Sequence, residues 1–390
     1  MVKSKNILSL FQENWVLEAR MIFGVTALWL FMGLLVLYSA SSKIALQDSG
    51  DAFYYVKQQL LWICLGLVLL RLITAFPLRD LFRIGTRGLI FMSILLAVTL
   101  FFSAPTNGSS RWIELGPVRL QPSELIKPFL LLQAAQLFGH WHRTSWPRRR
   151  FWLIVFGVIL LLILVQPSLS MTMFCSASLW LIALGAGLPI KHLLAVWVPG
   201  GAIALLSILI NPYQRGRIEA LINPLADPEG NGFQLIQSLM TVSSGELWGR
   251  GFGKSLQNTF LPEQYTDFVF SVFAEEYGLV GAVILILLLL AFAGLGMAVS
   301  NRAKDPVVKM VALGATVFLV GQSLFHIGVT VGLLPTTGIT FPFFSYGGSS
   351  MVSSLALAGL LIRAALEMEV AEVIPLRARR SRRKSGSLRA

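Results

Sequence analysis

The stretch GRGFGKS at residues 249–255 is the part of this sequence that comes nearest to a phosphate-binding loop. A nucleotide P-loop has a glycine, four further residues and then Gly-Lys-Ser or Gly-Lys-Thr, so that successive backbone N–H groups surround the phosphates. Here the first glycine would have to stand at position 248, which is Trp248. The spacing fails by one residue. Two interpretations stay open: a site for another kind of phosphate, or glycines that permit a tight turn.

A second group of side chains that could do chemistry lies at the edges of long apolar runs. Glu124 and Lys127 are three residues apart, a spacing that lets them pair on one face of a helix. Asp267, Glu275 and Glu276 stand where the apolar run that ends near residue 299 begins. Carboxylates can accept protons in catalysis, so the elements that carry these side chains decide what they can do.

The composition places these residues in a membrane protein. The chain of 390 residues is 55% apolar and only 13% charged, and its mean hydropathy is +0.71. Long apolar runs such as 151–166 and 280–298 recur along it, and no segment is both polar enough and long enough to be a soluble enzyme domain. Both cysteines, Cys64 and Cys175, fall within apolar runs, so no disulfide framework or metal cluster is indicated.

The apolar runs predict an all-α integral membrane protein with ten transmembrane helices, at about 20 residues for each crossing. The predicted ranges are 22–41, 58–76, 87–103, 122–139, 151–166, 169–187, 192–210, 268–299, 308–334 and 349–366. Residues 1–21 are expected to form a cytoplasmic N-terminal segment, residues 22–366 the membrane domain, and residues 367–390 a basic, disordered cytoplasmic tail. One long extracytoplasmic loop, 211–267, connects the seventh and eighth helices.

The positions of the lysines and arginines set the predicted orientation. With both termini in the cytoplasm, most of the bases fall on the cytoplasmic side, as the positive-inside rule requires. The net charge of +13 is therefore assigned to topology and to contact with anionic membrane lipids rather than to nucleic acid. The loop that contains GRGFGKS then faces outward, where ATP is not available, so a phosphate bound there would belong to a lipid headgroup.

Charged side chains at membrane depth are costly unless they are paired, hydrated or able to reach the surface. Such residues fall at or within the outer half of the predicted membrane domain: Glu124, Lys127, Asp267, Glu275, Glu276 and His326. They predict a polar cavity that opens to the outer surface. The alternative is a set of satisfied ion pairs that only hold helices together.

Three stretches of the sequence resemble the signatures of the SEDS family (shape, elongation, division and sporulation), which includes FtsW and RodA. They are SSRWIELGPVRLQPSELIKP at 109–128, GFQLIQSLMTVSSGELWGRGFGKSLQNTFLPEQYTDFVFSVFAEEYG at 232–278, and GLLPTTGITFPFFSYGGSS at 332–350. They occur in order along a ten-helix hydropathy pattern, so the resemblance covers nearly the whole chain.

The resemblance implies a peptidoglycan glycosyltransferase that polymerises lipid II, the undecaprenyl-pyrophosphoryl disaccharide pentapeptide, at the outer face of the bacterial cytoplasmic membrane. The family's key aspartate lies in a Pro-Glu-x-x-Thr-Asp-Phe motif, which matches residues 262–268 and implies Asp267 as the catalytic residue. The chemistry agrees, because the acceptor hydroxyl must lose a proton as the donor sugar parts from pyrophosphate, and a carboxylate can accept that proton.

The departing pyrophosphate also needs cations near it. The candidate residues for contact with the substrate are Lys127, Glu124, Arg215, Arg217, Arg111 and Glu275. For each of the bases, anchoring at the membrane interface is the alternative. No cofactor is indicated, and the sequence leaves a divalent cation open.

Three positions depart from the family pattern. Ser168, in QPSLSM, replaces an acid, Tyr265 stands where histidine is common, and His326 stands where asparagine is common. Loss of the acid at position 168 speaks against a role for that position in proton transfer or metal binding. None of the three departures touches Asp267.

The resemblance also implies protein partners: a class B penicillin-binding protein, that is, an FtsI-like transpeptidase, and other proteins of the division machinery. The compact stretch GFGKSLQNTFLPE at 251–263 favours the division branch of the family, hence a location at the septum. An elongation polymerase of the same chemistry is the alternative within the family.

Two functions of other classes compete with polymerisation. A flippase that moves lipid II needs a hydrophilic path through both leaflets, whereas the unexplained polar residues of this chain gather in the outer half. A non-catalytic scaffold for a penicillin-binding protein would not need Asp267. Replacement of that aspartate discriminates among all three functions.

Overall fold

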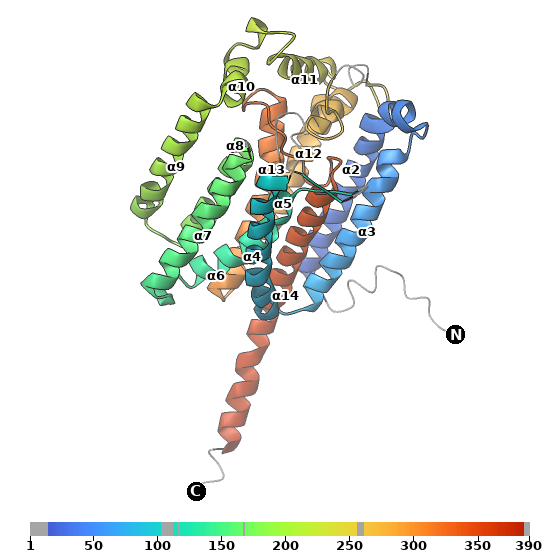
Figure 1. Cartoon of the computed structure of the whole chain (residues 1–390). Helices are drawn as coiled ribbons and strands as arrows, with labels where there is room; N and C mark the ends of the chain where they lie inside the picture. The colour runs from blue at the N-terminus through green and yellow to red at the C-terminus, as the bar shows by residue number, and fades with distance from the viewer. Residues whose placement is uncertain (1–14, 103–111, 116–117, 167, 256–260, 386–390) are drawn as a thin grey trace, which may run out of the picture.

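The computed structural model describes residues 15–102, 112–115, 118–166, 168–255 and 261–385. Most of these residues are helical, so the predicted mostly α-helical membrane fold is confirmed. Figure 1 shows the long helices side by side, with α10 (Pro212–Ile222) and α11 (Phe233–Ser244) at one end of the bundle. This end is called the α10 end below. The last part of α14 (Gly348–Ser385) extends beyond the opposite end.

Helices coincide with each of the ten predicted ranges. They are α2 (Leu17–Ser49), α3 (Tyr54–Ala75), α4 (Leu78–Phe102), α5 (Pro122–Leu125) with α6 (Lys127–Gly139), α7 (Trp146–Val165), α8 (Leu169–Gly185), α9 (Ile190–Ile210), α12 (Val269–Arg302), α13 (Pro306–Thr330) and α14. Within the described residues, seven are long and apolar enough to cross a membrane: α2, α3, α4, α9, α12, α13 and α14. The chain is therefore a multi-pass membrane protein.

The predicted helix over 122–139 is broken at Ile126. Proline has no N–H group, so Pro128 cannot donate the hydrogen bond that would continue the helix back to the carbonyl of Glu124. Ile126 keeps α-helical dihedral angles and its N–H still bonds to the oxygen of Pro122 at 3.0 Å, and α6 begins at Lys127. The break therefore interrupts the hydrogen bonds of the helix, without a sharp turn, at the residues that carry the Glu124–Lys127 pair.

The predicted loop over 211–267 contains regular structure. It holds α10, a short 3-10 helix (Pro224–Ala226) and α11. Ser238 in α11 joins this segment to the bundle, because its Oγ lies 2.7 Å from Ser271 Oγ in α12 and donates to the oxygen of Thr330 in α13 at 2.7 Å. A second addition to the predicted all-α fold is a two-stranded antiparallel ribbon, β1 (Ile113–Leu115) and β2 (Val118–Leu120).

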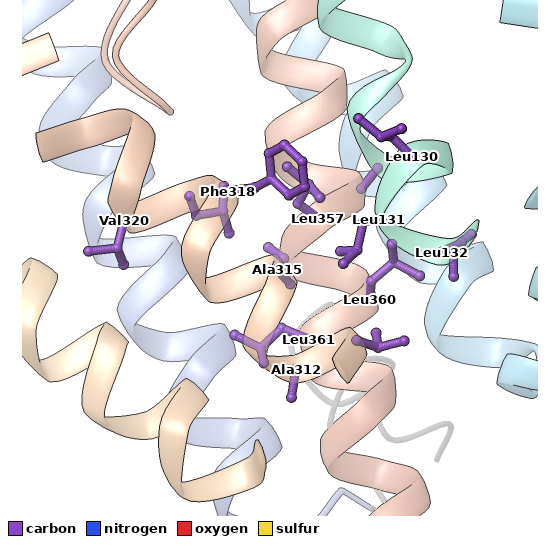
Figure 2. Close-up of a cluster of buried hydrophobic side chains, with 14 of the residues drawn as sticks. Leu130, Leu131, Leu132, Ala312, Ala315, Phe318, Val320, Leu357, Leu360 and Leu361 are labelled. Carbon is purple, nitrogen blue, oxygen red and sulfur yellow. The ribbon is translucent and has the colours of Figure 1, made fainter. Parts of the chain in front are cut away.

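The helices differ in how deeply they are buried. In α14, 83% of the apolar window is buried, whereas in α9 the figure is 6%, so α14 is a central helix and α9 lies at the rim. Figure 2 shows the packing around α14, where Leu357 and Leu361 meet Ala315 and Phe318 of α13 and Leu131 of α6. Because lipid tails are as apolar as these side chains, close packing rather than exclusion of water holds such helices together.

The last helix reaches past the predicted membrane domain, because α14 runs through Ser385. Disorder of residues 367–390 stays a prediction. At the start of this segment, Glu367 accepts hydrogen bonds from the backbone N–H of Leu78 at 2.6 Å and from Arg363 Nη2 at 2.9 Å.

Candidate active site

Asp267 lies in a tight turn directly before α12. The backbone N–H groups of Thr266, Asp267 and Phe268 all point to the carbonyl oxygen of Glu263, at 3.1, 2.9 and 3.3 Å. Glu263 adopts a left-handed conformation with φ of 53°, which a residue other than glycine rarely takes. The side chain of Asp267 is half-buried. It stands before the first segment of α12, which ends at a break at Gly278 with φ of 63°, and the N-terminal end of a helix favours negative charge.

The turn is held on one side by α2. Gln264, fully buried, donates its side-chain amide to the carbonyl oxygen of Ala40 at 2.9 Å. A buried amide donor of this kind costs free energy if its partner is lost, so the bond fixes the turn against the helix.

On another side the turn is held by the segment after α13, residues 331–347, called the crossing segment below. Ser345 Oγ donates to the oxygen of Thr266 at 2.5 Å, and the N–H of Tyr346 donates to the oxygen of Tyr265 at 2.8 Å. Gln59 in α3 supports the crossing segment in turn, because its side-chain amide donates to the oxygen of Ser345 at 3.1 Å. The contacts with α2 and with the crossing segment, which α3 supports, therefore fix the three residues directly before Asp267.

Tyr265 belongs to a cluster of tyrosines beside this turn. Its ring centroid lies 4.6 Å from that of Tyr55 and 5.9 Å from that of Tyr346, and its hydroxyl donates to the hydroxyl of Tyr55 at 3.3 Å. Burial, and then this hydrogen bond, raises the pKa of Tyr265. The hydroxyl of Tyr265 therefore stays neutral. The departure from histidine at this position places an uncharged aromatic residue in the cluster.

The pairing predicted for Glu124 and Lys127 is confirmed. Lys127 Nζ lies 2.6 Å from Glu124 Oε2, and it also donates to Gln322 Oε1 at 2.6 Å. Gln322 in α13 passes the connection on, donating to the carbonyl oxygen of Thr340 at 2.8 Å. Both charged side chains are only 1% exposed, so the pair is a satisfied internal bridge between α5, α6 and α13 that leads to the crossing segment. Its contact with substrate stays a prediction.

Glu275 lies in a different cluster. It is fully buried in α12 and accepts hydrogen bonds from Ser244 Oγ at 3.1 Å and from Ser255 Oγ, while Arg250 Nε lies 3.6 Å from its Oε1. Its neighbour Glu276 accepts from Ser39 Oγ. The sequence groups Glu275 and Lys127 around one predicted polar cavity, whereas the structure places them in separate clusters.

The same cluster answers what the glycines of residues 249–255 do. The N–H of Arg250 donates to the oxygen of Glu275 at 2.9 Å, and the N–H of Gly253 donates to Glu276 Oε1 at 3.1 Å. Gly249 has φ of 76°, and a Cβ there would lie 2.1 Å from the oxygen of Glu276. The N–H groups that would surround a phosphate are thus bonded to α12, and the glycines permit close approach of backbone to backbone.

The two predicted arginines that the structure describes, Arg215 and Arg217, form hydrogen bonds outside Asp267's turn. Arg215 in α10 is exposed and donates to the oxygen of Leu209. Arg217 donates to the oxygen of Thr336 in the crossing segment and borders a cavity described below. Arg111 lies outside the described residues.

His326 has a structural role. It is buried in α13, its Nδ1 lies 2.8 Å from the carbonyl oxygen of Ile339, and its ring stacks on Phe341 with the centroids 5.2 Å apart. Together with Gln322 it fixes the middle of the crossing segment. The sequence reasoning missed Gln322, Ser345 and Gln59, although Ser345 stands in the stretch FSYGGSS that the sequence resemblance includes.

Within the part of the chain that the structure describes, no group of three or more His, Cys, Asp or Glu residues could hold a metal ion. Ser168, at the position where the resemblance expects an acid, offers no carboxylate ligand. The described residues therefore do not fit a cation held by three or more protein side chains of these types.

Comparison with known proteins places this geometry in a family. A family model for FtsW, RodA and SpoVE, described as "Cell cycle protein", matches residues 19–369. The chain belongs to the FtsW/RodA/SpoVE family. A relative from Synechocystis sp., named "Probable peptidoglycan glycosyltransferase FtsW", is 47% identical over 365 residues, or 93% of either chain. These findings confirm the predicted SEDS family and enzyme class.

Solved structures agree with the family assignment. One, entitled "Structural coordination of polymerization and crosslinking by a peptidoglycan synthase complex", aligns with a TM-score of 0.73 and 29% identity, covering 91% of this chain and 99% of that chain. The rod shape determining protein RodA of Thermus thermophilus aligns with a TM-score of 0.66 and 27% identity, covering 90% of this chain and 98% of that one.

Proposed function

We propose that this chain is an FtsW-type polymerase that joins lipid II units into glycan strands, with Asp267 as the general base. The carboxylate accepts the proton of the acceptor's 4-hydroxyl while the bond from the donor's anomeric carbon to pyrophosphate breaks. The new glycosidic bond forms to that carbon, and undecaprenyl pyrophosphate leaves with the electron pair of the broken bond.

One observation carries the assignment of Asp267. Asp267 is half-buried and stands directly before the N-terminal end of α12, in a turn whose backbone is fixed by α2 and by the crossing segment. Two of the non-glycine residues with positive φ, Glu263 and Phe343, lie in the turn and in the segment that holds it. Backbone strain of this kind is retained where the surroundings enforce it, as they do at active sites.

The proposed topology follows from the charges and from the bundle. All ten predicted ranges cross the membrane, including α5 with α6, α7 and α8, and both termini lie in the cytoplasm. The α10 end then faces outward and carries Asp267's turn, where a lipid-borne sugar can arrive. The relative from Synechocystis sp. carries the FtsW name, which supports a place in septal rather than lateral wall synthesis.

The proposed partners are a class B penicillin-binding protein and other division proteins. Polymerised strands must be crosslinked, and the solved structure entitled as a peptidoglycan synthase complex aligns over 91% of this chain. A transpeptidase bound to this polymerase would receive each strand as it grows.

The proposal is tested with the full-length chain purified in nanodiscs together with its transpeptidase. Labelled lipid II is supplied, and glycan chains are separated by gel electrophoresis. Asp267→Ala should reduce polymer by at least about a hundredfold, the size of a lost general base. Glu229→Gln alters an exposed carboxylate in the same segment, residues 211–267, and this variant should polymerise lipid II like the wild type.

Two results would contradict the proposal. Polymer from Asp267→Ala at the wild-type level would remove the aspartate from the chemistry. Movement of labelled lipid II across liposomes by the wild type, lost in Asp267→Ala while polymerisation persists, would point to a flippase instead.

A further inference from the structure

A cavity at the α10 end is not explained by the proposed role of Asp267. It is an open pocket between the start of α8, α10 and the crossing segment, and its empty space of about 480 Å³ includes part of the surrounding solvent. Its lining residues are Ser168, Leu169, Ser170, Tyr213, Gln214, Arg217, Ile218, Pro335, Thr336, Thr337, Gly338 and Ile339. None of these is acidic, and Arg217 carries the only formal charge, so the lining favours an anion.

Arg217 is placed to serve such an anion. Its Nη1 donates to the carbonyl oxygen of Thr336, and its guanidinium lies over the ring of Tyr213, 4.7 Å from the centroid. A guanidinium has five N–H donors, and these contacts fix its plane while leaving most of them for another acceptor. Across the described residues, no carboxylate pairs with Arg217 within 4.0 Å, so its charge is not neutralised by the protein.

The start of α8 adds backbone donors to the same cavity. The first N–H groups of a helix have no partner inside it, and α8, 17 residues long, receives no hydrogen bond from the side chain of its N-cap, Ser168. The partial positive charge of a helix N-terminus favours an anion at this point.

Thr337 is an independent sign of a ligand. The residue is only 5% exposed, it lines the cavity, and its Oγ1 is buried without a hydrogen-bond partner. A buried hydroxyl of this kind costs free energy unless something bonds to it. A phosphate oxygen in the cavity would supply the partner.

We propose that this cavity binds the diphosphate group of an isoprenoid lipid, held by Arg217, the N-terminal N–H groups of α8 and the hydroxyl of Thr337. The inference rests on the proposed function and deepens it, because the chemistry releases such a diphosphate. Apolar side chains of Leu169, Ile218 and Ile339 border the same cavity, which suits a headgroup that continues into a lipid tail.

The serine at position 168 gives the inference a sharp test. An acid at this position would stand beside Arg217 and the start of α8, where it would neutralise the positive field that an anion needs. Ser168→Asp restores the acid of the family pattern, and it should fold at least as well as the wild type, since an acid stabilises a helix N-terminus, yet lose the anion. The proposed site is therefore assigned to this chain, with its serine, and not to relatives that carry the acid. Stability and binding move in opposite directions, so a loss of binding cannot be attributed to unfolding.

The experiment measures equilibrium binding to the full-length chain in phosphatidylcholine nanodiscs, with two probes: inorganic pyrophosphate and undecaprenyl diphosphate. Arg217→Gln and Ser168→Asp should weaken binding of the lipid probe by at least about tenfold, and Thr337→Val by about threefold to tenfold. Binding of both probes supports a site for the diphosphate alone. Binding of the lipid probe only supports a site that also requires the tail.

Unchanged binding in both Arg217→Gln and Ser168→Asp, or no binding of either probe by the wild type, would overturn the inference. Asp267→Asn separates it from the proposed function, because this variant should bind the lipid probe as the wild type does but should not polymerise lipid II. If Asp267→Asn polymerises normally, the base assignment fails, whereas the result for the cavity stands on its own binding data.

Discussion

Two buried acidic clusters in this protein hold their carboxylates in different ways. Glu124 is paired with a lysine 2.6 Å away, in a buried bridge between helices. Glu276, 1% exposed, accepts hydrogen bonds at Oε1 from the hydroxyl of Ser39 and the N–H of Gly253, whereas its Oε2 has no hydrogen-bond partner among the described residues.

The Glu124–Lys127 pair connects helices to one another, whereas Glu276 holds a loop against a helix. Removal of one partner from the Glu124–Lys127 pair leaves a full charge in the bundle interior, whereas removal of one of the two hydrogen bonds to Glu276 leaves the other in place. Asp267 differs from both, because it is half-buried and lies directly before the N-terminal end of a helix. The predictions below test this order of importance for stability.

Lys127→Met should have the largest effect. It leaves the carboxylate of Glu124 buried without its cation, which costs about 3–5 kcal/mol of unfolding free energy. The expected result is a large fall in the unfolding temperature, measured by tryptophan fluorescence during heating in detergent.

The double variant Lys127→Met with Glu124→Leu is the control for that prediction. It removes both charges and should recover most of the lost stability, because apolar side chains can replace a buried pair at little cost. A double variant as unstable as Lys127→Met would mean that the lysine acts through its bond to Gln322 rather than through the pair.

Glu276→Gln should have a smaller effect. The amide keeps the shape of the side chain but loses the charge that strengthens the bonds from Ser39 and Gly253, at a cost of about 1–3 kcal/mol. Residues 249–255 should then be cut faster by an added protease. Cleavage at the wild-type rate, with an unchanged unfolding temperature, would show that this carboxylate does not hold the loop.

Arg250→Gln should change stability less again. Glu275 is fully buried, but the side chain of Arg250 is 41% exposed and its Nε lies 3.6 Å from Glu275 Oε1. The pair is therefore longer and more screened than the Glu124–Lys127 pair, and its loss, together with the bond from Arg250 Nε to the oxygen of Ser244, costs about 1 kcal/mol. Glu275 keeps its bonds from Ser244 and Ser255. A fall in the unfolding temperature as large as that of Glu276→Gln would reverse the proposed ranking of the contacts.

Replacement of Asp51, which lies between α2 and α3, should have the smallest effect on stability. Hydrogen bonds from Lys57 and from the N–H of Phe53 lower the pKa of this exposed carboxyl below its ordinary value of 3.8. A lowered pKa in the folded state means that the contribution is present above that value and disappears as the pH falls through the folded pKa. Asp51→Asn should therefore lower the unfolding temperature slightly at neutral pH and match the wild type at a pH well below the folded pKa of Asp51. A difference that is larger at acid pH than at pH 7 would contradict this.

The sequence predicts the helices well because apolar runs of about 20 residues have few other structures open to them in a membrane. It also predicts the Glu124–Lys127 contact, which depends only on a local spacing of three residues. The break at Ile126 could have been expected from Pro128, since proline disrupts the hydrogen bonds of a helix.

The partners of Glu275 and Glu276 could not be predicted in the same way. Ser39 and Ser255 approach them from distant parts of the chain, and hydropathy carries no information on which hydroxyls will meet a given carboxylate. From position along the apolar runs alone, Glu275 is grouped with Lys127. Its tertiary contacts instead place Glu275 beside residues 249–255. The roles of Arg217 and Ser168 likewise depend on a cavity that only the packed structure defines.

The crossing segment borders both places where chemistry is proposed. Residues 335–339 line the cavity, Ser345 and Tyr346 hold the turn of Asp267, and bonds to His326 and Gln322 fix the stretch between them. A molecule that shifts one end of this stretch must move the other end or break those bonds. Departure of a spent carrier and arrival of the next sugar would then be thermodynamically coupled, as successive additions to one growing strand require.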